Sequence, residues 1–438
     1  MKDVKIGICG LGTVGSGVLE VLSKNADLIS ERSHIPLRVV HVSTRYERKD
    51  LETRGIAVSL DYRKVIADRE VQILIEAYGG TDVAGDIVRA AIAAGKQVIT
   101  ANKALIAEQG NELFALAAER GVSLRFEAAV AGGIPVIKAL REGLAANRIE
   151  WLAGIINGTG NFILSEMRDK ERQFADVLAE AQALGYAEAD PTFDVEGVDA
   201  AHKLTIMAAI AFGMPLRFDA VYTEGISSLI PEDLAYAGEL GYCIKHLGMA
   251  RQGENGVELR VHPTLLPTDL LLANVNGVKN AILVEGDAVG PTLYYGAGAG
   301  GSATASAVVA DCIDLARQLS ADQGCTVPPL GVTPGSVRDV PIIPMGEVQT
   351  AWYLRLSAKD EPGVMSQVSS ILGAQGISIE ALIQKAARGG ATQVPVVVIT
   401  NIASQSNLER AVASLEGLDV IVAPVTRIRV ETLDGQDA

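Results

Sequence analysis

Five acidic side chains and one lysine are concentrated in a short stretch of this chain, which reads GYAEADPTFDVEGVDAAHK from Gly185 to Lys203. Pro191 and Gly197 interrupt regular structure and predict a loop for the first part, whereas DAAHKLTIMAAIA predicts a helix. Asp199 and Lys203 are four residues apart, so they share one face of that helix. The acidic residues are Glu188, Asp190, Asp194, Glu196 and Asp199.

This acidic segment admits two interpretations. It is either a solvated loop with an exposed ion pair, which contributes roughly 0.3 to 0.5 kcal/mol, or a site for a small polar substrate. Such a substrate would carry an ammonium group, recognised by carboxylates, and an oxygen that gains or loses a proton. A calcium loop is disfavoured because the acids do not follow the D-x-D-x-D-G spacing.

The N-terminus contains a second motif with chemical meaning. VKIGIC alternates like a strand and leads into GLGTVG, and the helical pattern SGVLEVLSKN follows. G-x-G-x-x-G between a strand and a helix is typical of dinucleotide binding, because the glycines allow a tight turn and the helix N-terminus faces the pyrophosphate. The expected cofactor-binding residues of this motif are Gly10, Leu11, Gly12, Thr13, Val14 and Gly15.

Alternating strands and helices continue after this motif. Strand patterns occur in LRVVHVSTR, VQILIEAYGG, KQVITANK and VSLRFEAAV, and helical patterns separate them. We therefore predict an α/β protein whose first domain is a Rossmann-type doubly wound parallel sheet.

Residues at the end of the second predicted strand bear on the choice of cofactor. An NAD site usually has an acid there for the ribose hydroxyls, but this strand ends at Arg45, with Arg48 and Lys49 close by. These cations would suit the 2′-phosphate of NADP. Exposed turn charges are the alternative interpretation, and NAD stays possible.

Six blocks of sequence follow one another between about residues 4 and 320. They are GLGTVG, TANKALIA, EAAVAGGIPVI, GIINGTGNFIL, GYAEADPTFDVEGVDAAHKL and GAGAGGSATASAVVAD. In this order they resemble the homoserine dehydrogenase family, which interconverts L-homoserine and L-aspartate 4-semialdehyde with a nicotinamide cofactor, in the biosynthesis of threonine, methionine and isoleucine. One departure is Ala131, where the family frequently has a glycine.

The resemblance and the chemistry of aldehyde reduction together suggest roles in the acidic segment. Hydride transfer to an aldehyde places negative charge on its oxygen, so a nearby acid must supply a proton. We assign that role to Lys203, since a lysine ammonium is normally protonated at neutral pH, and expect Asp199 to hold it in place; a purely structural ion pair is the alternative for Asp199. The resemblance implies that Glu188 accepts the substrate ammonium, and we include Asp194 among the substrate-binding residues.

The resemblance implies further site residues outside the acidic segment. Lys103, at the strand end in TANK, would lie near the nicotinamide and the substrate, and Gly300 of GAGAGG would contact the cofactor. A sodium ion is implied as well, with hard oxygen ligands; a buried Glu127 bonded only to loop amides is the rival interpretation. The sodium ligands would be the Glu127 carboxylate and the carbonyl oxygens of Val130, Gly132 and Ile134.

Composition limits the possible partners. The 438 residues, 48% of them hydrophobic and 21% charged, predict two or three domains. The net charge of −15 disfavours nucleic acid and anionic membranes. The chain starts in a strand pattern without a leader, and it has no apolar run long enough to span a bilayer. Its four cysteines show no C-x-x-C spacing, so we expect a reduced, cytoplasmic protein; they are Cys9, Cys243, Cys312 and Cys325.

The order of these patterns predicts a domain organisation. We expect the NAD(P)-binding domain over residues 1–135, completed by a helix within 302–325, and a substrate and dimerisation domain over 136–301. Five prolines indicate a stiff linker over 326–350. Residues 351–430 follow the order β-α-β-β-α-β of a ferredoxin-like unit.

The turn DEPGVM and the segment GISIEAL in this last unit resemble the ACT domain, which binds amino acids as a regulator. The resemblance implies L-threonine as an inhibitor, bound near Asp360–Gly363 and Gly376–Ile379 of a neighbouring subunit. It also implies a homodimer or homotetramer. A plain dimerisation module is the alternative for this unit.

Two other function classes are alternatives to this interpretation. Another semialdehyde dehydrogenase that oxidises an aldehyde would need a nucleophilic cysteine with a partner histidine, and no cysteine here lies in a recognisable nucleophile turn. A non-enzymatic amino-acid sensor is the second, and the intact Lys103, Glu188 and Lys203 argue against it.

Overall fold

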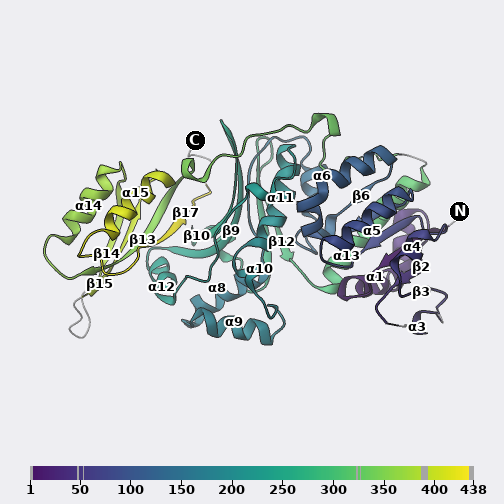
Figure 1. Cartoon of the computed structure of the whole chain (residues 1–438), viewed down its shortest axis with the longest axis horizontal. Helices are drawn as coiled ribbons and strands as arrows, with labels where there is room; N and C mark the ends of the chain where they lie inside the picture. The colour runs from purple at the N-terminus through teal and green to yellow at the C-terminus, as the bar shows by residue number, and fades with distance from the viewer. Residues whose placement is uncertain are drawn as a thin grey trace. The chain divides into compact units, whose positions relative to one another are not determined.

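The chain forms two compact units, whose helices and strands are drawn in Figure 1. The computed structural model describes residues 3–46, 49–52, 54–321, 324–325, 327–385 and 393–433. Unit 1 comprises Met1–Gly158, Val198–Val221 and Val278–Val340, and unit 2 comprises Thr159–Gly197, Tyr222–Gly277 and Pro341–Ala438. Within the described ranges, no helix is long and apolar enough to cross a membrane.

Unit 1 contains a six-stranded parallel sheet with the order β3-β2-β1-β4-β5-β6. The strand order reverses between β1 and β4, and dinucleotides bind at the carboxyl ends of the strands at such a switch point. This confirms the predicted Rossmann-type parallel sheet. The strands are β1 (Val4–Cys9), β2 (Leu37–Ser43), β3 (Ala57–Ser59), β4 (Ile73–Glu76), β5 (Gln97–Thr100) and β6 (Leu124–Arg125).

Helices cover both faces of this sheet, as expected for strands that are buried on both sides. On one face, apolar side chains of α1, α2 and α13 form a core with the strands. On the other, α4 contacts β1 and α5 contacts β4, and α5 packs against α6 (Figure 1). The helices are α1 (Thr13–Lys24), α2 (Ala26–Ser33), α3 (Lys49–Glu52), α4 (Tyr62–Ala67), α5 (Asp82–Ala93), α6 (Lys103–Arg120) and α13 (Gly301–Ser320).

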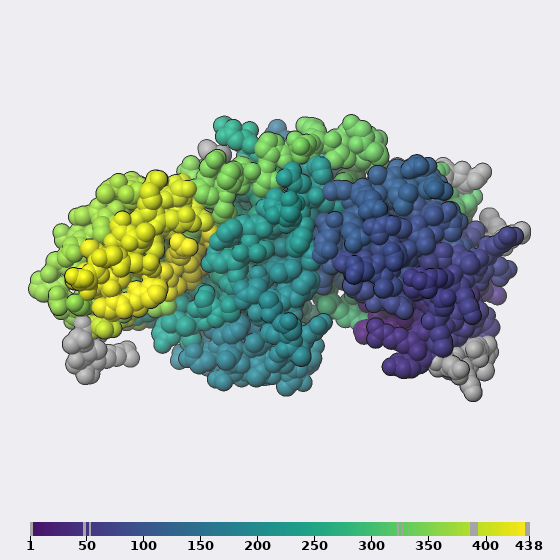
Figure 2. All heavy atoms as spheres, in the orientation of Figure 1, coloured from purple at the N-terminus to yellow at the C-terminus, as the bar shows by residue number. Residues whose placement is uncertain are grey.

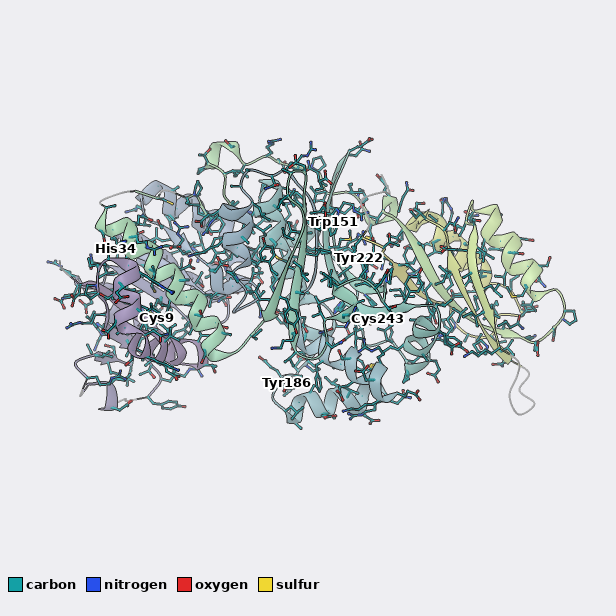
Figure 3. All side chains as sticks on the ribbon, turned by 180° about the vertical axis from the view of Figure 1, so that it is seen from behind. Cys9, His34, Trp151, Tyr186, Tyr222 and Cys243 are labelled. Atoms are coloured by element: carbon teal, nitrogen blue, oxygen red, sulfur yellow. The ribbon has the colours of Figure 1, made fainter. Side chains whose placement is uncertain are left out.

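Helix α13 returns to this sheet from far along the sequence. It is the long green helix beside α1 in Figure 3. The backbones of α1 and α13 approach closely: a Cβ atom added at Gly17 would lie only 2.7 Å from the carbonyl oxygen of Gly301. Two glycines therefore permit the packing of α13 on α1.

Unit 1 also contains a buried helix, an antiparallel sheet and the proline-rich stretch. Helix α11 (Val198–Phe212) is buried from Asp199 to Ile210 and packs against α6. The short α7 (Val136–Lys138) precedes a π-helical turn, and β7, β11 and β12 pair antiparallel in that order. Residues 327–340 lie at the surface of the unit, green in Figure 2. The three strands are β7 (Ile149–Ile155), β11 (Lys279–Gly286) and β12 (Gly290–Ala297).

Unit 2 contains a mixed sheet with the order β9-β10-β17-β13-β15-β14. Strands β9 and β10 form a long antiparallel hairpin, and β10 pairs parallel with β17. The strands are β8 (Tyr222–Thr223), β9 (Tyr242–Gly253), β10 (Gly256–Pro267), β13 (Gln349–Lys359), β14 (Ile379–Gln384), β15 (Gln393–Thr400), β16 (Ala403–Ser404) and β17 (Thr426–Val430). The helices are α8 (Gly158–Lys170), α9 (Phe174–Ala183), α10 (Thr192–Val195), α12 (Pro231–Glu239), α14 (Val364–Ala374) and α15 (Gln405–Glu416).

The C-terminal part of unit 2 has the predicted β-α-β-β-α-β order. Helices α14 and α15 share a core with side chains of β13, β14 and β15 (Figure 1). The other face contributes Tyr353, Ile399 and Ile428 to a second core, shared with α8, α9 and α12. The C-terminal strands are therefore packed between two apolar cores of the same unit.

Candidate active site

Lys203 and Asp199 meet on α11, as their spacing predicts, and Lys103 joins them. The Lys203 ammonium donates to Asp199 Oδ2 at 2.7 Å and to the carbonyl oxygen of Ile156 at 2.6 Å. Lys103 Nζ lies 2.7 Å from the other carboxylate oxygen, Oδ1. Asn157 also donates to Oδ2, at 2.7 Å. One buried carboxylate thus holds two ammonium groups and one amide.

The electrostatics of this cluster keep Asp199 ionised. Asp199 is 2% exposed and Lys203 8% exposed. Burial by itself would raise the pKa of the Asp199 carboxyl, but the charges of Lys203 and Lys103 outweigh it and hold that pKa well below its usual range. Lys103, with its side chain 35% exposed, is the more accessible of the two cations.

Lys103 owes its position to the junction of β5 and α6. Asn102 caps α6 by accepting from the Leu105 amide at 3.1 Å, and its own amide donates to the carbonyl oxygen of Gly80 at 2.6 Å. Lys103 is therefore the first residue of a capped helix, just after the carboxyl end of β5. This position is where the predicted fold places cofactor-facing groups.

A buried carboxyl group supports the same strand ends. Glu76, at the end of β4, accepts from the Thr100 hydroxyl at 2.5 Å and from the Tyr78 amide at 2.6 Å. Burial raises the pKa of Glu76. The side chain ties together the ends of β4 and β5.

The glycine-rich turn has the shape that a dinucleotide requires. Gly10 has φ +98°, and a Cβ there would lie 2.5 Å from the Ala77 carbonyl oxygen; a Cβ on Gly15 would lie 2.0 Å from the Gly10 carbonyl oxygen. At Gly12, in contrast, a Cβ would meet nothing within 4 Å. The turn is thus closed on the protein side and open where a pyrophosphate would approach, so its residues fit the predicted cofactor.

Arg45 and Gly300 both lie at this turn. A cavity of about 300 Å³ is lined by Gly10, Gly12 and the exposed Arg45, among others. Gly300 is the N-cap of α13 with φ +123°, and a Cβ on the next residue, Gly301, would lie 3.3 Å from the Thr13 carbonyl oxygen. The N-termini of α1 and α13 therefore meet at one place. Arg48 lies outside the described residues.

Glu127, the expected carboxylate ligand of the metal, lies beside a second buried carboxyl group, that of Asp311. Glu127 accepts from the amides of Ile137 and Lys138, at 3.0 and 2.8 Å, and its own amide donates to Asp311 Oδ2 at 2.9 Å. Burial and the neighbouring Asp311 raise the pKa of Glu127 to about 7, and burial raises that of Asp311 to about 6.

The chemistry of this donor set fits a hard cation. Asp311 Oδ1 is buried and has no hydrogen-bond partner among the described residues. Ala131 and Gly132 both have positive φ, +52° and +46°, so the loop turns sharply between Val130 and Ile134. A cation bound to Glu127 would offset the cost of two adjacent buried carboxylates.

The other acidic residues of the motif belong to unit 2. Glu188 and Asp190 are exposed, and Asp194 is half-buried on α10. Hydrogen bonds from Thr192 lower the pKa of Asp190. Glu196 accepts from the Ser227 hydroxyl at 2.7 Å. These acidic residues come from unit 2, whereas the contacts described above around Lys203 come from unit 1.

Comparisons with known proteins agree with this geometry. Residues 135–313 match the homoserine dehydrogenase family model, residues 10–127 match the model of the NAD-binding domain of homoserine dehydrogenase, and residues 352–417 match the ACT domain model. The homoserine dehydrogenase of Pseudomonas aeruginosa is 57% identical over 434 residues, which is 99% of this chain and 100% of that protein.

The chain belongs to the homoserine dehydrogenase family.

Solved structures support the same family assignment. The crystal structure of a homoserine dehydrogenase from Thiobacillus denitrificans has a TM-score of 0.94 and 55% identity, covering 99% of each chain. A hyperthermophilic archaeal homoserine dehydrogenase in complex with NADPH has a TM-score of 0.60 and 26% identity, covering 72% of this chain and 97% of that one. The predicted family, fold class and enzyme class, an oxidoreductase that acts on a CH–OH group and has an NAD-binding domain, are confirmed.

Membership in the family gives the sequence departure at residue 131 a physical meaning. Ala131 has φ +52°, a backbone conformation that favours glycine. A glycine there would be unstrained, and the alanine pays about 1 kcal/mol for the left-handed conformation.

Three functional contacts escaped the sequence analysis. Ile156 and Asn157 hold the Lys203–Asp199 pair from the end of β7, and Asp311 on α13 faces Glu127. Asn157 could have been noticed, because it is the first polar residue after the apolar strand pattern in GIIN. Asp311 could not, because it bonds a residue 184 positions away.

Two of the four cysteines, Cys9 and Cys312, are unsuited to act as a nucleophile. Cys9, Cys243 and Cys312 are buried, the first two labelled in Figure 3, and Cys325 is exposed. Burial raises the pKa of Cys9 to about 12 and raises that of Cys312 even further from neutrality. Thiols that stay protonated are poor nucleophiles, which argues against the aldehyde-oxidising alternative.

Proposed function

We propose that this chain catalyses the NADP-dependent interconversion of L-homoserine and L-aspartate 4-semialdehyde, a step in the biosynthesis of threonine, methionine and isoleucine. The observation that carries the proposal is the buried Lys103–Asp199–Lys203 cluster, in a unit that also contains the dinucleotide turn. When bound, the nicotinamide supplies or accepts the hydride.

Lys203 is the proposed general acid in the direction of aldehyde reduction. The hydride adds to the aldehyde carbon, the C=O electron pair moves to oxygen, and the Lys203 ammonium donates a proton to that oxygen. Asp199 holds the ammonium in place and stabilises its charge. Lys103, the more accessible cation, completes the positive environment around the developing oxyanion.

Glu188 is the proposed partner of the substrate ammonium. Asp194, later in the same acidic segment, is proposed as a second substrate-binding carboxylate. The exposure of Glu188 leaves it accessible to a ligand. An ammonium–carboxylate hydrogen bond is charge-assisted and therefore strong.

Arg45 supports the proposed preference for NADP over NAD. Its side chain is exposed and lines the cavity beside the glycine turn, at the end of β2. A guanidinium at this position can bind a 2′-phosphate. Arg45→Ala should lower kcat/KM with NADP and leave kcat/KM with NAD nearly unchanged, and an unchanged ratio would contradict the assignment.

A sodium ion is proposed at Glu127, with the carbonyl oxygens of Val130, Gly132 and Ile134. The buried Glu127 and Asp311 carboxyls support this proposal. The residues would hold the cation as hard oxygen ligands, and its charge would favour the ionised form of Glu127.

The C-terminal unit is proposed to be regulatory. L-Threonine is the proposed inhibitor, bound near Asp360–Gly363 and near Gly376–Ile379 of a neighbouring subunit in a homodimer or homotetramer. The ACT match over residues 352–417 supports amino-acid binding. A reducing, cytoplasmic location is proposed as well, and the free thiol of the exposed Cys325 agrees with it.

The experiment that tests the function is an assay of homoserine-dependent NADP reduction by the full chain. Glu188→Gln should raise the KM for homoserine at least tenfold, because a charge-assisted contact is lost. Asp190→Asn, in the same exposed loop, is the matched control and should keep the wild-type KM. No homoserine-dependent reduction would overturn the function, and a KM effect in the control alone would move the substrate contact to Asp190.

A further inference from the structure

Two helices of unit 1 supply the lysine cluster, α6 with Lys103 and α11 with Asp199 and Lys203. They pack against each other (Figure 1). A second polar contact joins the same helices. His202, which directly precedes Lys203, has Nε2 3.1 Å from Oε1 of Glu108 on α6. The lysine cluster and this second contact therefore involve the same pair of helices.

The spacing of the two contacts limits how α6 can rotate against α11. Glu108 follows Lys103 by five residues on α6, and His202 follows Asp199 by three residues on α11. At about 1.5 Å per residue, the contacts are about 7.5 Å apart along α6 and about 4.5 Å apart along α11. One contact alone would let a helix pivot about it, whereas two contacts separated along the axes oppose that rotation. The second contact therefore helps to keep Lys103 facing Asp199.

The imidazole of His202 is itself held in a fixed orientation. The residue is 2% exposed. Its ring stacks on that of Phe218, with the ring centroids 4.1 Å apart and the planes at 25°. Phe218 begins a short 3-10 helix, Phe218–Ala220, of the same unit. An aromatic ring and a carboxylate thus fix the imidazole together.

The protonation state of His202 suits a contact beside two ammonium groups. Burial lowers its pKa; the carboxylates of Glu108 and Asp199 oppose this shift, Lys103 adds to it, and the net direction is downward. The imidazole is therefore neutral at pH 7. Because a carboxylate only accepts hydrogen bonds, the imidazole hydrogen is on Nε2. His202 thus binds Glu108 without adding a third positive charge next to Lys103 and Lys203.

We propose that His202 is a positioning residue for the dehydrogenase reaction, which keeps Lys103 at Asp199 through its hydrogen bond to Glu108. The inference rests on the role proposed above for Lys103. In this role His202 contacts neither substrate nor cofactor and acts only through Lys103. Its loss should therefore lower kcat, where Lys103 stabilises the developing oxyanion, and leave the KM for homoserine nearly unchanged.

A kinetic double-mutant cycle tests whether His202 acts through Lys103. His202→Ala should lower kcat for aldehyde reduction about fivefold, because a small misplacement of a catalytic group slows the reaction. In a Lys103→Met background the same substitution should have no further effect on kcat, since no ammonium is left to position. Equal losses of kcat in both backgrounds would mean that His202 only supports the fold, and would overturn the proposal.

Variants on both sides of the hydrogen bond separate it from packing. Glu108 has a side chain that is 38% exposed, so Glu108→Ala should fold and should reproduce the loss of kcat, even if His202→Ala does not fold. His202→Gln keeps an N–H donor and should restore most of kcat. A glutamine variant no better than the alanine variant would overturn the proposal, because ring packing on Phe218 would then fix the helices.

His41 provides the matched control. It lies in the same unit, is 9% exposed, and has its two ring nitrogens 2.8 Å from Asp68 Oδ2 and 2.8 Å from Ser59 Oγ. His41→Ala therefore also removes a buried, hydrogen-bonded imidazole, but away from the contact of α6 with α11. It should keep wild-type kcat, and a loss equal to that of His202→Ala would count against the proposal.

Chemical labelling of Lys103 gives a readout that does not need dehydrogenase activity. In His202→Ala and Glu108→Ala, reductive methylation of Lys103 should become severalfold faster than in the wild type, because its amine is no longer held at the buried Asp199. The exposed Lys64 is the internal reference. Faster labelling in an inactive wild-type background would overturn the proposed function and uphold the positioning role. Unchanged labelling and unchanged kcat in both variants would overturn only the positioning role.

Discussion

Two buried lysines, Lys203 in unit 1 and Lys245 in unit 2, differ in the charge of their hydrogen-bond partners. Lys203 is 8% exposed, and its ammonium meets the Asp199 carboxylate at 2.7 Å. Lys245 is 1% exposed, and its partners among the described residues are uncharged oxygens. They are the Val275 carbonyl at 2.6 Å, Asn276 Oδ1 at 3.1 Å and Asn161 Oδ1 at 3.3 Å.

The difference lies in the charge of the partner and not in the number of hydrogen bonds. Burial lowers the pKa of Lys245 to about 8, since neutral oxygens cannot replace the water that stabilises an ammonium. A carboxylate within hydrogen-bond distance favours the ammonium form. The first arrangement suits a proton donor, and the second suits a side chain that holds loops together.

Removal of the Lys203 amine should have the largest effect. Lys203→Ala should lower kcat for aldehyde reduction about 100-fold or more, because a general acid is lost, while the dissociation constant of NADP changes little. Steady-state kinetics and cofactor titration measure the two quantities. Lys64→Ala, an exposed lysine of the same unit, is the control. Wild-type kcat in Lys203→Ala would contradict the assigned role.

Neutralising Asp199, the charged partner of Lys203, should have the next largest effect on kcat. Asp199→Asn keeps the shape of the side chain but leaves two lysines around an uncharged amide. The loss of the carboxylate favours the neutral amines, so we expect kcat to fall about tenfold and the alkaline decline of aldehyde reduction to begin at lower pH. A pH–rate profile that coincides with the wild type would show that the carboxylate does not hold the proton donor.

Lys245→Met tests the lysine with uncharged partners, through its effect on the free energy of unfolding. Because the pKa of Lys245 is lowered from 10.5 to about 8 in the folded state, the unfolded chain binds this proton more tightly. Wild-type stability should therefore rise with pH through the window from about 8 to 10.5, by about 1 kcal/mol between pH 7 and pH 9.

The methionine variant lacks this rise. At pH 7 it should be less stable by about 1 to 3 kcal/mol, since it leaves buried oxygens without a donor. Urea denaturation at pH 7 and pH 9 gives both quantities. Parallel stability curves for the two proteins would mean that Lys245 keeps an ordinary proton affinity in the fold.

The smallest effect concerns the reactivity of the cysteine thiols. Cys325 is exposed, whereas burial raises the pKa of Cys9 to about 12. Native protein should therefore label at Cys325 with a thiol reagent, and all four cysteines should label in denaturant. Rapid native labelling of Cys9, detected by peptide mass spectrometry, would show that β1 opens readily.

Local patterns predicted the parts of this protein that depend on local spacing. The four-residue separation of Asp199 and Lys203 was enough to pair them, and strand–helix alternation was enough for the parallel sheet. Contacts between residues far apart in the sequence could not be predicted from it. Asn157 reaches Asp199 of α11 from the segment that follows β7. Lys245 is buried in a strand whose sequence, YCIKHLG, gives no reason for a buried lysine.

The C-terminal unit illustrates the same limit. Its β-α-β-β-α-β order is a local property and was predicted from the sequence. Its packing is not local: Tyr353 on β13 donates to Asp233 of α12 at 3.0 Å, and Arg355 binds the same buried carboxylate at 2.6 Å. Truncation before β13 would leave Asp233 buried without a cation, and for this reason single substitutions are the better tests of regulation.

The packing of α13 on the first sheet also sets the order in which this protein can fold during translation. Val308, Cys312 and Leu315 of α13 complete a core to which β1, β2, β4 and the first two helices also contribute. The ribosome delivers those strands first and must synthesise the chain through residue 320 before the core can close. At about 5 to 20 residues per second, the nascent sheet presents an uncovered apolar face for on the order of ten seconds. We therefore expect the growing chain to be bound by chaperones that recognise exposed apolar strands.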